Sequence, residues 1–168
     1  MSAPSESDLA RVAAALGEAL RARGWRLATA ESSTGGLIGH AITMNSGASD
    51  YYAGGVICYS NLAKEITLGV PHELIEAHGA VSEEVAAALA VGAAHRFETE
   101  LGLSVTGIAG PEGGSEWKPI GTHFVAVARR GHPARVVRHV YIHDRDGNRA
   151  AAAHAALELA LDEVLAAP

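Results

Sequence analysis

Apolar residues near the start of the chain recur every three or four positions, from Leu9 to Leu20. That spacing puts them on one face of a helix and leaves the opposite face polar. Ser5 and Ser7 precede the pattern, and serine is a favoured residue at the start of a helix. Gly24 follows it and is a natural stop. The pattern therefore predicts an amphipathic first helix that ends at Gly24.

Beyond Gly24, short apolar or β-branched runs alternate with helical patterns and with stretches rich in glycine. Such runs predict strands where turn residues bound them, and the 3.6-residue period predicts helices. Ser82 marks a helix start, because a serine there can cap the first turn. The predicted strands are residues 25–30, 54–60, 103–107, 122–130 and 134–142. The predicted helices are residues 35–44, a short stretch after Asn61, a short helix from Pro71 to Ile75, residues 81–97 and a closing helix from about Asn148 to Leu165.

This order of elements predicts a three-layer α/β/α sandwich around a mixed, mostly parallel sheet. The last two strands flank Gly131, His132 and Pro133, which indicates one antiparallel hairpin. No linker, internal repeat or charge block divides the chain, so residues 1–168 are expected to form a single domain. Ligands of such sheets bind at the carboxyl ends of the strands. Three polar stretches fall there, at residues 29–36, 59–64 and 105–121.

Charge and cysteine content narrow the class of protein. The formal net charge of −6 gives no basic footprint for a nucleic acid or an anionic membrane. Cys58 is the single cysteine, so no intramolecular disulfide can form, which suits a reducing compartment. Charged residues interrupt the apolar positions before the first predicted strand, which argues against a signal peptide or a membrane span. We therefore expect a soluble, cytoplasmic protein.

The stretch TAESSTGG (residues 29–36) carries more polar groups than a simple turn needs. Its hydroxyls and main-chain N–H groups lie at the start of a predicted helix, where an anion or a developing oxyanion is stabilised. A helix cap with a tight turn is the alternative interpretation. The stretch lacks the glycine that precedes the serine of a nucleophile elbow, which argues against an α/β-hydrolase. The candidate residues are Ser32, Ser33, Thr34, Gly35 and Gly36.

A serine nucleophile needs a base, and YSNLAK (residues 59–64) offers Lys64. Lysine acts as a base only when neutral, so its pKa must fall from about 10.4 to about 7–8, which burial can achieve. Tyr59 could orient the serine or relay a proton. A solvated helix surface is the alternative for Lys64, since most lysines are exposed.

Other motifs in the chain point to no further chemistry. SEWK (residues 115–118) fits the S-x-x-K pattern, but the glycines and proline around it predict a loop. GIAGPEGG (residues 107–114) lacks the Lys-Ser/Thr of a phosphate-binding loop and is either a backbone cradle or a flexible loop.

Histidine, cysteine and arginine residues give weaker signals. His139 and His143 are predicted to share one face of a strand, but no carboxylate cluster at ligand spacing accompanies them, so no metal site is expected. Cys58 is read as a packing residue in the middle of a strand. Arg145 and Arg149 are either a charged helix start or a phosphate clamp.

Six motifs, taken in order, resemble the CinA C-terminal domain family, whose enzymatic members are nicotinamide mononucleotide deamidases. The resemblance runs from about Leu27 to Arg149, nearly the whole chain. The chain looks like the stand-alone form of the family, without the N-terminal nucleotide-processing domain of longer members. The motifs are AESSTGG (30–36), YSNLAK (59–64), GAVSEEVA (79–86), VTGIAGPEGG (105–114), KPIGT (118–122) and DRDGNR (144–149).

The resemblance implies roles for particular residues. It places the nucleophile at Ser32, with Tyr59 and Lys64 as its partners. It implies no metal and no organic cofactor. It further implies a substrate cradle that includes Ser33, Thr34, Gly35, Gly36, Thr106, Gly107 and Gly110, with Arg145 on the phosphate side.

The leading hypothesis is hydrolysis of nicotinamide mononucleotide to nicotinic acid mononucleotide and ammonia, in pyridine nucleotide salvage. Ser32 would attack the amide with Lys64 as base, and N–H groups near Thr34 to Gly36 would hold the oxyanion. One alternative is a non-catalytic module of the same fold that binds a pyridine nucleotide or a partner protein. Another is a serine amidohydrolase with a different small amide as substrate. The number of subunits stays open, with a homo-oligomer as one outcome.

Overall fold

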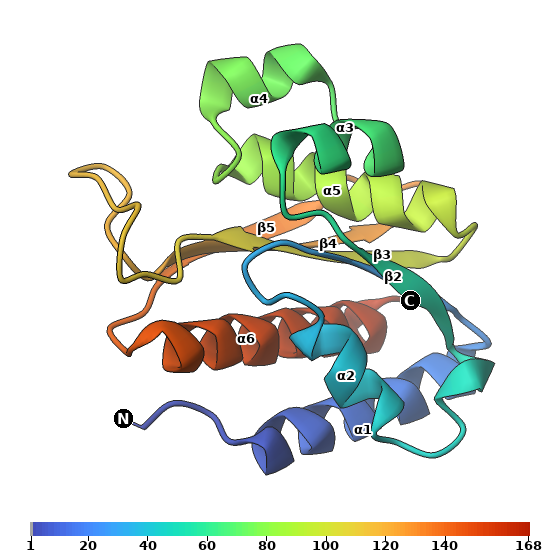
Figure 1. The fold of residues 1–168 in the computed structure, drawn as a ribbon. Coiled ribbons are helices and arrows are strands. Elements are labelled where there is room, and N and C mark those ends of the chain that lie inside the picture. The colour runs from blue at the N-terminus through green and yellow to red at the C-terminus, as the bar shows by residue number, and fades with distance from the viewer. Residues whose placement is uncertain (1) are drawn as a thin grey trace.

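The computed structural model describes residues 2–168 and confirms the three-layer sandwich (Figure 1). Helices α1, α2 and α6 cover one face of the sheet, and α3, α4 and α5 cover the other. The helices are α1 (Glu6–Arg23), α2 (Leu37–Thr43), η1, a 3-10 turn (Ala48–Asp50), α3 (Asn61–Leu68), α4 (His72–His78), α5 (Glu83–Arg96) and α6 (Arg145–Ala166). The strands are β1 (Leu27–Glu31), β2 (Tyr52–Ile57), β3 (Leu101–Gly107), β4 (Thr122–Arg129) and β5 (Arg135–Val140).

The five strands form one sheet in the order β2-β1-β3-β4-β5. Strand β1 pairs in parallel with both β2 and β3. Strand β4 pairs antiparallel with β3 and with β5, so four of the five strands run in the same direction. The predicted mixed, mostly parallel sheet with a β4–β5 hairpin is thus confirmed.

Several element boundaries differ from the sequence prediction for identifiable reasons. Helix α6 begins at Arg145, about one turn early, because the Asp144 side chain accepts a hydrogen bond from the Gly147 N–H and caps the helix. Strand β5 ends at Val140, so the prediction that His139 and His143 share a strand face is wrong. Strand β2 ends at Ile57, so Cys58 lies just beyond the strand and not in its middle.

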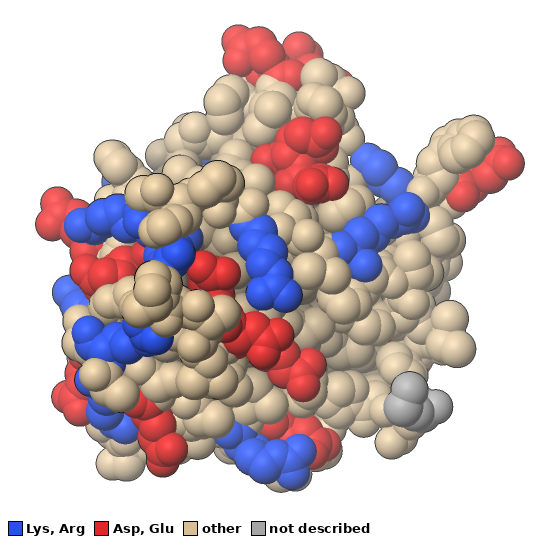
Figure 2. Space-filling model, turned by 180° about the vertical axis from the view of Figure 1, so that it is seen from behind, with Lys and Arg blue, Asp and Glu red and all other residues tan. Residues whose placement is uncertain are grey.

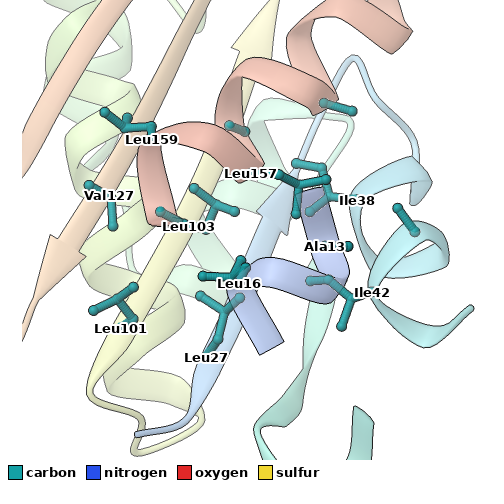
Figure 3. Packing of buried hydrophobic residues seen from close by; sticks show 14 of the residues in the cluster. Ala13, Leu16, Leu27, Ile38, Ile42, Leu101, Leu103, Val127, Leu157 and Leu159 are labelled. Carbon is teal, nitrogen blue, oxygen red and sulfur yellow. The ribbon is translucent and has the colours of Figure 1, made fainter. Parts of the chain in front are cut away.

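The largest apolar cluster fills the space between the sheet and helices α1, α2 and α6 (Figure 3). Leu16 of α1, Leu103 of β3 and Leu157 of α6 meet there and are fully buried. Two smaller clusters on the opposite face pack α5 against the sheet. Because both faces are covered, the central strands β1 and β3 are buried along almost their whole length.

The parallel strands β1, β2 and β3 end at the same edge of the sheet. The turn after β1, the connection after β2 and the long loop after β3 therefore gather there, beside the start of α6. The predicted candidates in residues 29–36, 59–64 and 105–121 are brought together by this topology.

The face of the molecule opposite to the view of Figure 1 carries mixed charge. Basic and acidic side chains are interspersed there (Figure 2). Within residues 2–168 no helix has the length and apolar character needed to cross a membrane.

Two leucines of α6 offer a matched test of the core. Leu157→Ala should lower the free energy of unfolding by about 3 kcal/mol, because Leu157 is fully buried and its removal leaves a cavity. Leu165→Ala, at a position that is 66% exposed, should change it by less than about 0.5 kcal/mol. Urea unfolding of both variants measures this, and equal losses would contradict the assignment of the core.

Candidate active site

A cavity of about 170 Å³ lies at the carboxyl ends of β1, β2 and β3. Seven of the residues predicted from the sequence line it, and they come from the β1 turn, the β2–α3 connection, helix α3, the end of β3 and the start of α6. Thr34, Gly35, Gly36 and Gly110, also predicted, are not part of its lining. The seven lining candidates are Ser32, Ser33, Tyr59, Lys64, Thr106, Gly107 and Arg145.

Lys64 reaches Ser32 across the cavity floor. Ser60 caps α3, and Lys64 in the first turn of that helix points into the protein, where only 1% of it is exposed. Its Nζ donates hydrogen bonds to Ser32 Oγ at 3.3 Å, to the Cys58 carbonyl at 2.8 Å and to the Tyr59 carbonyl at 3.4 Å. The alternative of a solvated lysine is therefore wrong.

Burial lowers the pKa of Lys64, and the nearby Cys58 and Tyr59 groups act in the opposite direction. Within residues 2–168, no carboxylate forms an ion pair with Lys64. An amine that is desolvated without a counter-charge is biased toward its neutral form. Neutral Lys64 has a lone pair to accept a proton from Ser32.

The Glu31 carboxylate organises the turn that carries Ser32. It accepts hydrogen bonds from Thr34 Oγ1 at 2.7 Å and from the N–H groups of Gly36 at 3.0 Å, Ile38 at 3.1 Å and Gly39 at 2.8 Å. Gly36 has a φ of 99°, which favours glycine and lets the chain fold back onto this carboxylate. The start of α2 is thus already occupied by a negative group.

These bonds correct one part of the sequence hypothesis. The Gly36 N–H donates to Glu31, and the Gly35 N–H donates to the Ser32 carbonyl. Neither group is free to hold an oxyanion, so that assignment is wrong at these two positions. Glu31 belongs to the motif TAESSTGG, but no sequence pattern indicated that its carboxylate would bind these N–H groups.

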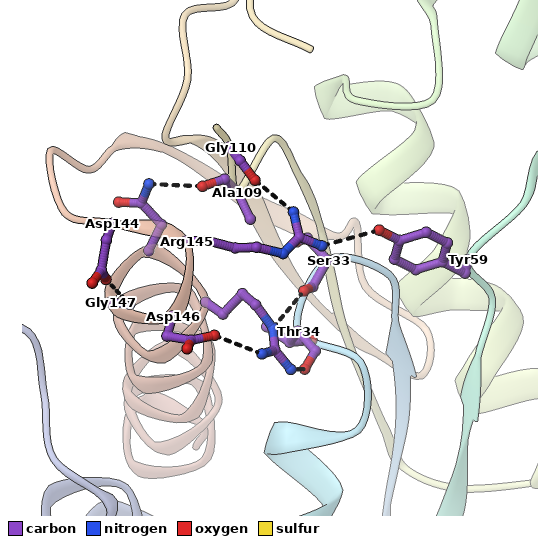
Figure 4. Close-up of polar contacts among 11 residues, drawn as sticks. Ser33, Thr34, Tyr59, Ala109, Gly110, Asp144, Arg145, Asp146 and Gly147 are labelled. Atoms are coloured by element: carbon purple, nitrogen blue, oxygen red, sulfur yellow. Dashed lines mark hydrogen bonds and ion pairs between the residues drawn. The ribbon is translucent and has the colours of Figure 1, made fainter. Parts of the chain in front are cut away.

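Tyr59 and Arg145 meet at the cavity mouth (Figure 4). Arg145 donates to the Tyr59 hydroxyl at 3.3 Å and to the Gly110 carbonyl at 2.6 Å. The Tyr59 side chain is turned toward Arg145, and it is the Tyr59 main-chain carbonyl that contacts Lys64. This geometry suits a binding role for the Tyr59 ring better than the predicted proton relay.

Gly107 and Thr106 shape the wall contributed by β3. Thr106 donates to the Ala80 carbonyl, which ties the strand to the segment before α5. A Cβ on Gly107 would lie 2.1 Å from the ring of buried His123, so only glycine fits there. Burial lowers the pKa of His123, which disfavours a positive charge behind this wall.

Helix α6 contributes Asn148, which the sequence did not indicate, and Arg149, which was one half of the possible phosphate clamp and instead binds main-chain carbonyls. Buried Asn148 donates to the Ala109 carbonyl and accepts from the His143 N–H, joining the long loop to the helix. Arg149 donates to the Ser33 carbonyl at 3.2 Å and to the Thr34 carbonyl at 3.0 Å. Asn148 and Arg149 follow Arg145 by three and four positions. Residues at this spacing share a helix face, and this was the signal in the sequence that could have placed them at the site.

The residues of the candidate site include no metal centre. Within residues 2–168, no group of three or more His, Cys, Asp or Glu side chains is arranged to hold a metal ion.

Comparison with protein families and with known sequences gives concordant matches. Residues 9–164 match the model of the CinA C-terminal domain. A "CinA-like protein" of Salinibacter ruber is 50% identical over 145 residues, which cover 86% of this chain and 35% of that protein. "Nicotinamide-nucleotide amidohydrolase PncC" of Enterobacter agglomerans is 40% identical over 161 residues, 96% of this chain and 98% of that protein. The chain spans about a third of the length of several of the curated relatives that it matches.

Solved structures agree with the fold. The competence damage-inducible protein A (ComA) of Klebsiella pneumoniae superposes with a TM-score of 0.91 at 32% identity, covering 95% of this chain and 99% of that one. The competence/damage inducible protein CihA of Agrobacterium tumefaciens has a TM-score of 0.86 at 36% identity, covering 96% and 99%.

The burial of Lys64 predicts a pH-dependent effect on stability. Its pKa is lowered in the folded state from the ordinary value of 10.5, so unfolding takes up a proton between the two pKa values. The free energy of unfolding of the wild type therefore rises with pH through this window, by about 1.4 kcal/mol for each unit of pKa difference. Lys64→Met lacks the titrating group and should lack this rise.

Urea unfolding of both proteins at intervals from about pH 7 to about pH 10 measures the effect. The stability of Lys64→Met relative to the wild type should fall as the pH is raised. A difference that stays constant over the whole range would show that Lys64 has an unshifted pKa.

Proposed function

The chain belongs to the CinA C-terminal domain family, and on that premise we propose that it is an amidohydrolase that converts nicotinamide mononucleotide to nicotinic acid mononucleotide and ammonia. The observation that carries the proposal is the contact between Lys64 Nζ and Ser32 Oγ in the wall of the cavity. The name of the Enterobacter agglomerans relative, which aligns along nearly its whole length, supports this choice of substrate.

In the first step, Ser32 Oγ attacks the carboxamide carbon while Lys64 takes the serine proton. The carbonyls of Cys58 and Tyr59 accept two hydrogens of the amine, which leaves the third direction, toward Ser32, for its lone pair. Two main-chain acceptors thus orient the base without adding a counter-charge that would keep it protonated.

In the second step, the carbon–nitrogen bond of the tetrahedral intermediate breaks. The protonated Lys64 gives its proton to the leaving nitrogen, which departs as ammonia and leaves an acyl group on Ser32. Water then attacks the acyl carbon, with Lys64 accepting its proton and returning it to Ser32 Oγ. The products are nicotinic acid mononucleotide and the free enzyme.

The cavity mouth provides groups that suit a nucleotide. The guanidinium of Arg145 offers a positive charge for phosphate, and the exposed ring of Tyr59 offers an apolar face for an aromatic base. The Tyr59–Arg145 contact holds these two groups side by side. The proposed location is cytoplasmic, where such a salvage reaction would meet its substrate.

Removal of either proposed catalytic side chain should abolish turnover. Ser32→Ala and Lys64→Met should each reduce kcat by at least about 10³-fold, because the nucleophile and its base act as one unit. Ammonia release from nicotinamide mononucleotide measures this, with folding checked by circular dichroism. Ser115→Ala and Lys118→Met, in the loop between β3 and β4 and outside the cavity lining, are the matched controls and should keep the wild-type rate. Near-normal turnover in Ser32→Ala or Lys64→Met would refute the assignment of roles.

The pH profile gives a second test. Since only neutral Lys64 can accept the serine proton, kcat/KM should rise with pH along a limb whose midpoint lies below the ordinary lysine value of 10.5. The rate of the wild type is measured from about pH 5 to about pH 10 in buffers of constant ionic strength. A profile that falls with increasing pH over this range would be incompatible with a lysine base.

A further inference from the structure

The main-chain turn next to Ser32 is held by charged side chains on two sides. On one side the Glu31 carboxylate binds the N–H groups of Gly36, Ile38 and Gly39. On the other side the Arg149 guanidinium binds the carbonyls of Ser33 and Thr34. If either Glu31 or Arg149 moved away, the N–H groups or carbonyls that it binds would lose their hydrogen-bond partners, which costs free energy in a partly buried turn.

This arrangement leaves a defined set of donors unused. The N–H groups of Ser33 and Thr34 donate no hydrogen bond within residues 2–168, unlike those of Ser32, Gly35 and Gly36. In a trans peptide the N–H points opposite to the carbonyl of the preceding residue. Because Arg149 holds the Ser33 carbonyl, the Thr34 N–H points away from Arg149.

The Ser33 hydroxyl is a second, independent observation that points to a bound ligand at this wall of the cavity. Ser33 lines the cavity and is only 6% exposed, yet its Oγ has no hydrogen-bond partner within residues 2–168. A buried hydroxyl without a partner costs stability, so its retention at a cavity wall points to a partner that arrives with a ligand. Ser33 shares the cavity lining with Arg145 and Tyr59, and Figure 4 shows these three residues in one region of the site.

We propose that Ser33 is a catalytic residue whose hydroxyl and N–H, with the N–H of Thr34, receive the negative charge on the substrate carbonyl oxygen, and that Arg149 is a positioning residue that holds these donors in place. The inference rests on the proposed function, because it assumes that Ser32 attacks a carbonyl carbon. It moves the oxyanion site away from the start of α2, which Glu31 neutralises, to the two peptides that directly follow the nucleophile.

Two substrates separate this inference from the proposed function. Nicotinamide mononucleotide tests the full reaction through ammonia release. 4-Nitrophenyl acetate tests only the acyl transfer: Ser32 Oγ bonds to the acetyl carbon, 4-nitrophenolate leaves, Lys64 takes the serine proton, and water then releases acetate. The ester needs no nucleotide recognition, so its rate reports on the nucleophile, the base and the oxyanion donors.

Ser33→Ala is the first variant. It should lower kcat about 10²-fold on both substrates while KM changes less than about threefold, because the lost donor acts mainly in the transition state. Its melting temperature should stay the same or rise, since the deleted hydroxyl makes no hydrogen bond to any of residues 2–168. Ser33→Thr keeps a hydroxyl and should recover most of the rate. A structural role for Ser33 would instead lower the melting temperature along with the rate.

Arg149→Gln is the second variant, and Asp146→Asn is its matched control. Arg149→Gln should lower kcat about 10-fold to 100-fold with little change in KM, because small displacements of aligned groups have effects of this size. Asp146→Asn removes only the exposed ion pair of Arg149 and should leave the rate within about twofold. Arg149→Lys keeps the positive charge but not the paired donors of the guanidinium. It replaces Arg149→Gln in the same rate measurement if Arg149→Gln does not fold.

Each outcome decides the inference. If Ser33→Ala hydrolyses the ester within about threefold of the wild-type rate, the oxyanion role of Ser33 is wrong. If the wild type hydrolyses the ester no faster than Ser32→Ala, both the inference and the proposed mechanism fail. If the ester reaction depends on Ser33 and Arg149 but no ammonia is released from nicotinamide mononucleotide, the inference stands and the proposed substrate is wrong.

Discussion

The four hydrogen bonds accepted by the Glu31 carboxylate are the interaction on which the geometry of the site depends. A buried carboxylate is tolerated only when it is fully hydrogen-bonded, and bonds to a charged group are stronger than neutral ones. Three of its donors are main-chain N–H groups from one short segment, so the chain after Ser32 can follow only one path. That path positions Ser32, fixes the start of α2 and leaves the N–H groups of Ser33 and Thr34 without an acceptor in the described part of the chain.

Lys64 is also buried, but its surroundings do not favour its charged form as those of Glu31 do. Its acceptors are two carbonyls and a hydroxyl, and no carboxylate among residues 2–168 pairs with it, so these residues do not compensate a positive charge there. Such a group lowers the stability of the folded state at neutral pH and keeps the neutral amine accessible. Active sites commonly hold groups of this kind, because the pKa that catalysis requires differs from the one that folding favours.

The sheet topology and α6 assemble these local features. Parallel pairing places the ends of β1, β2 and β3 at one edge, which brings Ser32, Tyr59 and Thr106 to one cavity. Helix α6 then closes the site by contacting all three loops. Arg149 donates to the Ser33 carbonyl, Arg145 to the Tyr59 hydroxyl and Asn148 to the Ala109 carbonyl. The long apolar contact of α6 with the sheet makes this closure rigid.

The sequence by itself determined the order of helices and strands, the sandwich, the hairpin and the motif residues, because hydrophobic period, capping and turn chemistry act over a few neighbouring residues. It also indicated Ser32 and Lys64, through the motifs that resemble a known family. Only the tertiary structure decided that Lys64 reaches Ser32, that the Tyr59 hydroxyl meets Arg145, and that Gly35 and Gly36 have no free N–H group. The contacts of Lys64 with Ser32 and of Tyr59 with Arg145 join residues that are 32 and 86 positions apart. No local pattern encodes such pairs, since they form only after the packed layers have brought separate loops together.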